Sequence, residues 1–277
     1  MQNNLDVIIP CHQAEGTLRQ AAQSALAQPQ VRTVWLIDDA STDGTAAVMK
    51  QLAEEHPRIR CEYLAQNGGA ARARNWGLLN SEADITAFLD ADDRYEDGVL
   101  EAACMALEKL PQLSLVRLRL HPDGFPEHYT RHKDFPTAWQ RLEMTVGGNT
   151  VFRRTALLAC GGFPQHKLFR RFGGEDAALG IALTRASVVG TLFDPRLPAV
   201  RHRYREGMHA ERLLGAELFG RPPVGITGQH QAEAEQITQK ICASLSTART
   251  ILNVPQTGIM PLQVTFSQGF GNLYKGA

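Results

Sequence analysis

Short apolar runs alternate with helix-like segments from the start of the chain to Leu120. The apolar runs, bounded by polar or turn residues, predict buried strands at Leu5–Ile9, Thr33–Ile37, Ile59–Leu64, Ile85–Leu89 and Leu113–Leu120. The segments between them have apolar residues at helical spacing and predict helices at Glu15–Ala27, Thr45–Glu55, Ala70–Asn80 and Gly98–Leu110. Such alternation indicates crossover connections, and therefore a mainly parallel sheet with helices on both faces.

This regular pattern ends at His121. The segment from there to Gly148 is rich in Pro, His and aromatic residues, which predicts a long surface loop with a short helix. The chain breaks again at Arg221-Pro222-Pro223. The later elements that the pattern predicts are strands at Thr150–Arg153 and Val188–Phe193, helices at Asp176–Arg185 and Gln231–Thr250, and an irregular tail to Ala277.

Composition narrows the class of protein. The 277 residues include 29 Lys+Arg and 29 Asp+Glu, and this charge balance argues against nucleic acid as the main partner. No apolar run is long enough for a transmembrane segment, and the N-terminus lacks the basic start of a signal peptide. The five cysteines are widely spread and form no CxxC pair, a pattern typical of free thiols in a reducing compartment. The sequence therefore predicts a cytoplasmic protein.

Carboxylates gather where two of the predicted strands end. Asp90, Asp92 and Asp93 follow one strand directly, and Asp38 and Asp39 end another. Ligands of parallel sheets bind beyond the carboxyl ends of the strands, and crowded carboxylates need a cation or hydrogen-bond donors to offset their repulsion. Hard oxygen ligands suit Mg²⁺ or Mn²⁺. The alternative interpretation is a pair of solvated turns that cap the following helices.

Two glycine-rich segments also precede predicted helices. Asn67-Gly68-Gly69 leads into a helix that carries Arg74, and small residues there let a helix approach a phosphate closely. Gly173-Gly174 precedes Glu175 and Asp176, which have the chemistry of a general base beside an acceptor hydroxyl. The structural alternatives are an Ala-rich helix with exposed arginines and a helix start stabilised by acidic residues.

In this order and spacing, the segments resemble the family 2 glycosyltransferases of the GT-A fold. The segments that carry the resemblance are Val7-Ile8-Ile9-Pro10 with Glu15, Trp35–Thr45, Asn67-Gly68-Gly69 with Ala73–Gly77, Phe88–Asp93, and Gly174-Glu175-Asp176. The resemblance implies an α/β chain with a Rossmann-like, mainly parallel central sheet flanked by helices. It implies a GT-A domain over residues 1–220, made of a nucleotide-sugar-binding half (1–120) and an acceptor half (121–220), with a C-terminal helical extension over 221–277.

The resemblance also implies roles for residues on the donor side. Asp39 is expected to contact the nucleotide base, commonly uracil, in a pocket shaped by Pro10 and Glu15. Arg74 is expected near the nucleotide and Asp90 near its ribose.

On the catalytic side, Asp92 is expected to bind Mn²⁺ or Mg²⁺, assisted directly or through water by Asp93. His202 is expected at the diphosphate or the metal, with a structural histidine as the alternative. Asp176 is expected to be the general base, with Glu175 beside it. The resemblance thus implies single displacement with inversion, from a UDP-sugar to a hydroxyl group.

The sequence departs from the family pattern after Pro10, where Cys11-His12-Gln13 replaces the usual Tyr-Asn. The QxxRW signature of processive synthases is absent, which favours addition of a single sugar.

The acceptor alternatives are a saccharide, a lipid-linked compound or another hydroxyl compound. The basic stretch 117–133 is interpreted as a solvated face or, alternatively, as a surface for an anionic acceptor. The tail after Gly220 is interpreted as a cover for the active site, a packing element or the contact of a homodimer.

Two other functions have specific requirements. A sugar nucleotidyltransferase needs a Gly-rich loop with Arg and a downstream Lys after the first strand, and Pro10-Cys11-His12-Gln13 has neither. A degenerate glycosyltransferase that serves as a binding or scaffold protein remains the non-enzymatic alternative, against which Asp92, Asp93 and Asp176 argue.

Overall fold

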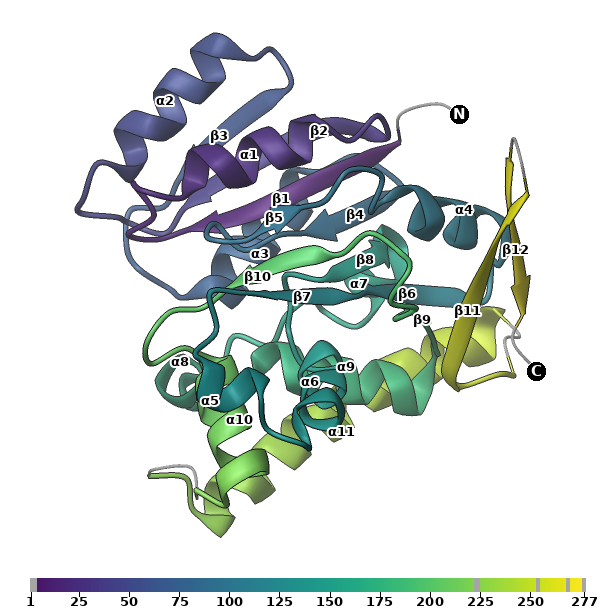
Figure 1. The fold of residues 1–277 in the computed structure, drawn as a ribbon. Helices are drawn as coiled ribbons and strands as arrows, with labels where there is room; N and C mark the ends of the chain where they lie inside the picture. The colour runs from purple at the N-terminus through teal and green to yellow at the C-terminus, as the bar shows by residue number, and fades with distance from the viewer. Residues whose placement is uncertain (1–3, 222–224, 253–254, 268–269, 276–277) are drawn as a thin grey trace.

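A mixed sheet runs through the centre of the computed structural model, which describes residues 4–221, 225–252, 255–267 and 270–275 (Figure 1). Its nine strands are, in chain order, β1 (Leu5–Cys11), β2 (Val31–Asp38), β3 (Ile59–Tyr63), β4 (Ile85–Phe88), β6 (Leu113–Leu118), β8 (Thr150–Arg153), β9 (Val188–Leu192), β11 (Gly258–Ser267) and β12 (Phe270–Lys275). Their order across the sheet is β12-β11-β9-β6-β8-β4-β1-β2-β3.

The strand directions determine which chain segments meet at one edge of the sheet. Strand β1 is parallel to both of its neighbours, with Ile8 opposite Trp35 of β2 and Phe88 of β4. Strand β8 is antiparallel to both β4 and β6. The segment that enters β8 therefore lies at the same edge as the carboxyl ends of β1, β2 and β4, the edge at which parallel sheets bind ligands.

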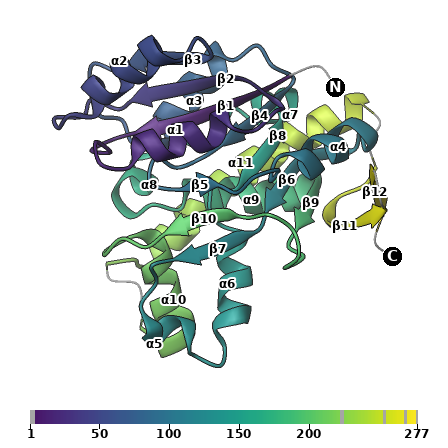
Figure 2. The same ribbon diagram turned by 45° about the horizontal axis from the view of Figure 1, so that its top comes forward.

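Helices cover both faces of the sheet (Figure 2). One apolar cluster joins the inner sides of α1 (Leu18–Leu26), α2 (Thr45–Glu55) and α4 (Glu101–Lys109) to one face. A second cluster joins α3 (Ala70–Asn80), α7 (Arg154–Ala159), α9 (Glu175–Ala186) and α11 (Gly228–Leu252) to the other face. Side chains of β1 alternate between the clusters, because successive residues of a strand point to opposite faces.

A small second sheet lies beside the carboxyl edge of the large one. It consists of β5 (Arg94–Tyr95), β10 (Val200–Arg203) and β7 (Leu120–Asp123), in this order. The remaining helices are α5 (Glu127–Thr130), α6 (Phe135–Glu143), α8 (Lys167–Phe172) and α10 (His209–Phe219). In the described part of the chain, no helix is both long and apolar enough to span a membrane. All five cysteines are free thiols, as the sequence predicts.

The structure confirms the predicted strand–helix alternation and corrects three local predictions. The segment 121–148 contains β7, α5 and α6 instead of a long loop, because Tyr129 and Trp139 pack into the core. Arg117, the first residue of the basic stretch interpreted as a solvated face or as a surface for an anionic acceptor, is buried. The tail after 252 is not irregular, since β11 pairs in parallel with β9 and buries Leu262 and Val264.

Candidate active site

A cavity of about 540 Å³ opens at the carboxyl edge of the large sheet. This volume lies in the range of pockets that enclose small ligands. The predicted site residues that line it are Pro10, Asp39, Arg74, Asp90 and Asp92. Five other predicted residues lie outside the lining and contact each other, a lining residue or a nearby loop. They are Glu15, Asp93, Glu175, Asp176 and His202.

Asp39 anchors the glycine loop to the end of β2. Its two carboxylate oxygens accept hydrogen bonds from the backbone amides of Gly68, at 2.8 Å, and Gly69, at 2.7 Å. Gly69 has φ of +86°, a conformation that favours glycine. Asp39 is only 2% exposed but lines the cavity, so a ligand there meets a carboxylate that two amides already orient.

The residues that depart from the family pattern also build the cavity. Cys11, His12 and Gln13 all line it. Gln13 has φ of +51°, and its side-chain oxygen accepts a hydrogen bond from the backbone amide of Thr42 at 2.7 Å. A non-glycine residue at positive φ costs roughly 1–3 kcal/mol, and here hydrogen bonds to the neighbouring loop offset that cost. Backbone and side chains at 11–13 therefore both shape the pocket.

Glu15 lies beside this loop, outside the cavity lining. Its carboxylate accepts a hydrogen bond from the backbone amide of Gly44 at 3.0 Å. A Cβ atom on Gly44 would lie 2.6 Å from Glu15 Cδ, so the contact requires glycine at this position. Glu15 thus joins the start of α1 to the start of α2 and supports the wall of the pocket.

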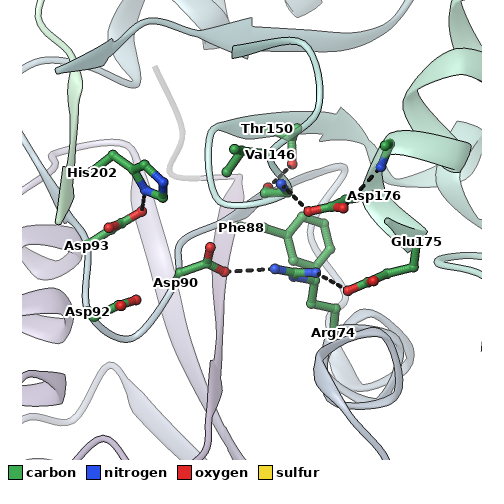
Figure 3. Close-up of polar contacts among 12 residues, drawn as sticks. Arg74, Phe88, Asp90, Asp92, Asp93, Val146, Thr150, Glu175, Asp176 and His202 are labelled. Carbon is green, nitrogen blue, oxygen red and sulfur yellow. Dashed lines mark hydrogen bonds and ion pairs between the residues drawn. The ribbon is translucent and has the colours of Figure 1, made fainter. Parts of the chain in front are cut away.

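Arg74 links the two sides of the site (Figure 3). Its guanidinium donates to Asp90 Oδ1 at 2.8 Å and to Glu175 Oε1 at 3.4 Å, and stacks over the Phe163 ring at 5.2 Å. The side chain is 4% exposed. Burial alone would lower the pKa of Arg74, but the nearby carboxylates outweigh it and raise the pKa, so the cation persists. Because it is paired on both sides, this guanidinium joins α3 to the start of α9.

Gly147 and Gly148 lie against these side chains at the entrance to β8. A Cβ atom on Gly147 would lie 2.9 Å from Arg74 Cζ, and one on Gly148 would lie 2.9 Å from Asp90 Oδ2. The two glycines therefore leave space for the ion pair between Arg74 and Asp90.

The two acidic residues of α9 differ in their surroundings. Asp176 Oδ2 accepts from the backbone amide of Gly147 at 2.8 Å, and Asp176 Oδ1 accepts from the amide of Ala177 at 3.0 Å. Each oxygen keeps a second lone pair that can accept a further hydrogen bond. Burial, followed by the charge of Asp176, raises the pKa of Glu175 to about 7, against the opposite effect of Arg74. Backbone amides therefore hold the carboxylate of Asp176, whereas that of Glu175 is paired with Arg74.

Asp93 orients His202. The Asp93 carboxylate lies 2.8 Å from His202 Nδ1 and also accepts from the backbone amide of Arg203 at 2.9 Å. Burial raises the pKa of Asp93 to about 6, although His202 pulls it down. Burial disfavours a charged imidazole, but the neighbouring carboxylates outweigh it and raise the pKa of His202. Both oxygens of Asp93 are therefore engaged within the protein.

One buried atom near this pair, His202 Nε2, has no hydrogen-bond partner. Arg205, which the sequence pattern did not single out, lines the cavity and forms an ion pair with Asp92 Oδ2. Among the described residues, no group of three or more His, Cys, Asp or Glu side chains is arranged to hold a metal ion. Asp92 and His202 carry carboxylate and imidazole donors of the kinds that Mn²⁺ accepts, and a cation here would need its other ligands from outside the protein, such as a bound phosphate group.

The family model for glycosyl transferase family 2 matches residues 6–172, more than half of the chain. The chain belongs to this family. Two curated relatives are the succinoglycan biosynthesis protein ExoU of Rhizobium meliloti and the uncharacterized glycosyltransferase YibD of Escherichia coli, each 36% identical. The matches cover 34% and 38% of this chain, and only 28% and 31% of those relatives.

Solved structures of glycosyltransferases have the same fold. One is S. aureus TarS 1–349 in complex with UDP-GlcNAc. It matches with a TM-score of 0.54 at 18% identity, over 90% of this chain and 74% of that chain. The mannosyltransferase PcManGT of Pyrobaculum calidifontis, in complex with GDP-Man and Mn²⁺, matches with a TM-score of 0.56 at 20% identity, over 92% and 76%. These likenesses show that this member of the family has the GT-A fold, as the sequence predicts.

Proposed function

We propose that this glycosyltransferase transfers one sugar from a UDP-sugar to an acceptor hydroxyl, with inversion at the anomeric carbon. The observation that carries the proposal is the cavity lined by Asp39, Arg74, Asp90 and Asp92, which Arg74 connects to the acidic start of α9. UDP-GlcNAc and UDP are bound by the structural neighbour TarS, which supports a uridine nucleotide as donor.

The donor side binds and orients the nucleotide. Asp39, which two backbone amides hold in the cavity wall, meets the base, and Asp90 meets the ribose. Arg205 lies beside Asp92 and supplies positive charge for the diphosphate. Asp92 and His202 would hold a Mn²⁺ or Mg²⁺ ion, which would supply further positive charge against the negative charge that develops on the leaving nucleoside diphosphate.

The acceptor side removes a proton. Asp176 takes the proton of the acceptor hydroxyl, while the acceptor oxygen forms a bond to the anomeric carbon and the bond to the nucleoside diphosphate breaks. Attack from the side opposite the leaving group inverts the configuration. The backbone amide of Gly147 holds the Asp176 carboxylate in position. The ion pair with Arg74 offsets the negative charge of Glu175, which would otherwise repel that carboxylate.

Titration calorimetry with UDP, with and without Mn²⁺, tests the donor site. We expect binding that weakens sharply without the metal, and Asp92→Asn should weaken metal-dependent binding while Lys50→Ala, an exposed helix substitution, should not. If UDP bound neither with nor without Mn²⁺, the proposal would be contradicted, and another nucleotide or a degenerate scaffold would be favoured.

Asp176→Asn separates chemistry from binding. We expect transfer to fall by roughly 10²–10⁴-fold, the usual contribution of a general base, while UDP affinity is retained. Transfer at near-normal rate by the folded variant, measured as release of UDP, would exclude Asp176 as the base.

A further inference from the structure

A second cavity, of about 520 Å³, adjoins the donor cavity. Both cavities are lined by Gly69 and Ala70, so they meet at the start of α3. The second cavity is mostly basic, and its Arg and Lys residues are Arg72, Lys167, Arg170, Arg171 and Arg212. They come from three separate parts of the chain: the start of α3, helix α8 and helix α10.

These cations have no acidic counterparts. Within the described parts of the chain, none of the five lies in an ion pair with a carboxylate. Glu175 is the acidic residue in the lining, and its carboxylate is already paired with Arg74. A concave, basic surface without counter-charges attracts and concentrates anions. This charge is more than a nucleotide bound in the neighbouring cavity would use, because Arg205 already lines that cavity.

Two of the arginines also donate hydrogen bonds to backbone oxygens. Arg72 donates to the backbone oxygen of Gln66 at 3.0 Å, and Arg170 donates to that of Asn67 at 2.7 Å, so both support the glycine loop of the donor site. Lys167 and Arg212 are exposed, and Arg212 Nη2 lies beside Gly173. Lys167 and Arg212 are therefore the cations best able to meet a ligand without loss of a loop contact.

We propose that the second cavity binds an acceptor that carries a phosphate group. The inference rests on the proposed function. Glu175 lines the cavity and directly precedes Asp176, so a ligand whose phosphate lies among the cations can present a hydroxyl to Asp176. The acceptor is thus recognised through its anionic group at α8 and α10, and reacts at the start of α9.

Titration of inorganic phosphate into the ¹⁵N-labelled protein, saturated with UDP and Mg²⁺, tests the inference by NMR. Saturating UDP keeps phosphate out of the donor cavity. We expect saturable amide shifts over residues 167–174. The double variant Lys167→Ala/Arg212→Ala should bind phosphate at least about tenfold more weakly and UDP as tightly as the unaltered protein. The matched control, Lys50→Ala/Lys240→Ala, removes the same charge from exposed sites elsewhere and should leave phosphate affinity unchanged.

Three results would overturn the inference. The first is absence of saturable shifts, the second is equal phosphate affinity in the double variant, and the third is saturable shifts confined to residues 12–13 and 90–92. UDP binding without phosphate binding would refute the acceptor inference alone. Failure of UDP to bind would refute the proposed donor site and, with it, the role of the basic cavity in an acceptor reaction.

Discussion

At the scale of single residues, the site depends on a buried cation that cannot move. Arg74 is held by Asp90 on one side and Glu175 on the other, with the Phe163 ring beneath it. Gly147 and Gly148 leave the space that this arrangement fills. A guanidinium fixed in this way keeps two half-buried carboxylates in place without mutual repulsion, which a flexible surface arginine would not achieve.

Gly147→Ala tests this close packing. The added Cβ would lie 2.9 Å from Arg74 Cζ, and the ion pairs prevent the guanidinium from giving way. We expect the free energy of unfolding to fall by about 1–3 kcal/mol, the usual cost of overpacking. Gly16→Ala is the control, because a Cβ there meets nothing within 4 Å. Equal denaturation midpoints for both variants would show that the loop moves freely.

At the scale of elements, helix α6 is attached to β7 through a buried acid. Glu143 Oε1 accepts a hydrogen bond from the backbone amide of Leu120 at 2.8 Å. Burial raises the pKa of Glu143 to about 7, although this hydrogen bond and Arg119 lower it. The folded protein therefore holds a proton that the unfolded chain releases near its ordinary pKa of 4.5.

This difference predicts a loss of stability with rising pH. Between pH 4.5 and 7 the folded state binds more protons at Glu143, so its contribution is fully present below pH 4.5 and declines as pH rises through 7. Between pH 5 and pH 8, the free energy of unfolding should fall by about 2–3 kcal/mol less in Glu143→Gln than in the unaltered protein. Urea denaturation at several pH values measures this difference, and the exposed substitution Glu127→Gln is the control. Identical pH slopes for all three proteins would contradict the assignment.

At the scale of the whole molecule, β11 extends the sheet that carries the site. Leu262 is 4% exposed, and its Cδ1 would lie 2.8 Å from a Cβ on Gly190 of β9. Ile259, on the same strand, is 52% exposed. The segment after α11 therefore contributes to the same core as the N-terminal strands.

Leu262→Ala measures that contribution. We expect the free energy of unfolding to fall by about 2–4 kcal/mol, as for other buried Leu to Ala changes. Ile259→Ala should cost less than about 1 kcal/mol, since its side chain is largely solvated. A single unfolding transition should be kept in both. If the two variants were equally stable, β11 would not be docked on β9.

The sequence pattern predicted best those helices and strands whose bounds depend on neighbouring residues in the chain. The bounds of α2, α3 and β8 match the prediction exactly as Thr45–Glu55, Ala70–Asn80 and Thr150–Arg153, because apolar spacing decides those elements. β11 escaped prediction because it depends on pairing with β9, a partner distant in sequence. The burial of Arg117 escaped prediction because backbone oxygens of Glu143 and Val146, rather than any acid, accept its hydrogen bonds.

The place of β8 in the sheet bears on how the protein is made. β8 lies between β4 and β6 although it follows both in the chain. While synthesis has reached only residue 149, the facing edges of β4 and β6 have no partner, and such edges pair readily with other chains. Domains begin to fold while they emerge from the ribosome. A nascent chain of this length is therefore an expected client of chaperones that shield strand edges until residues 150–153 close the gap.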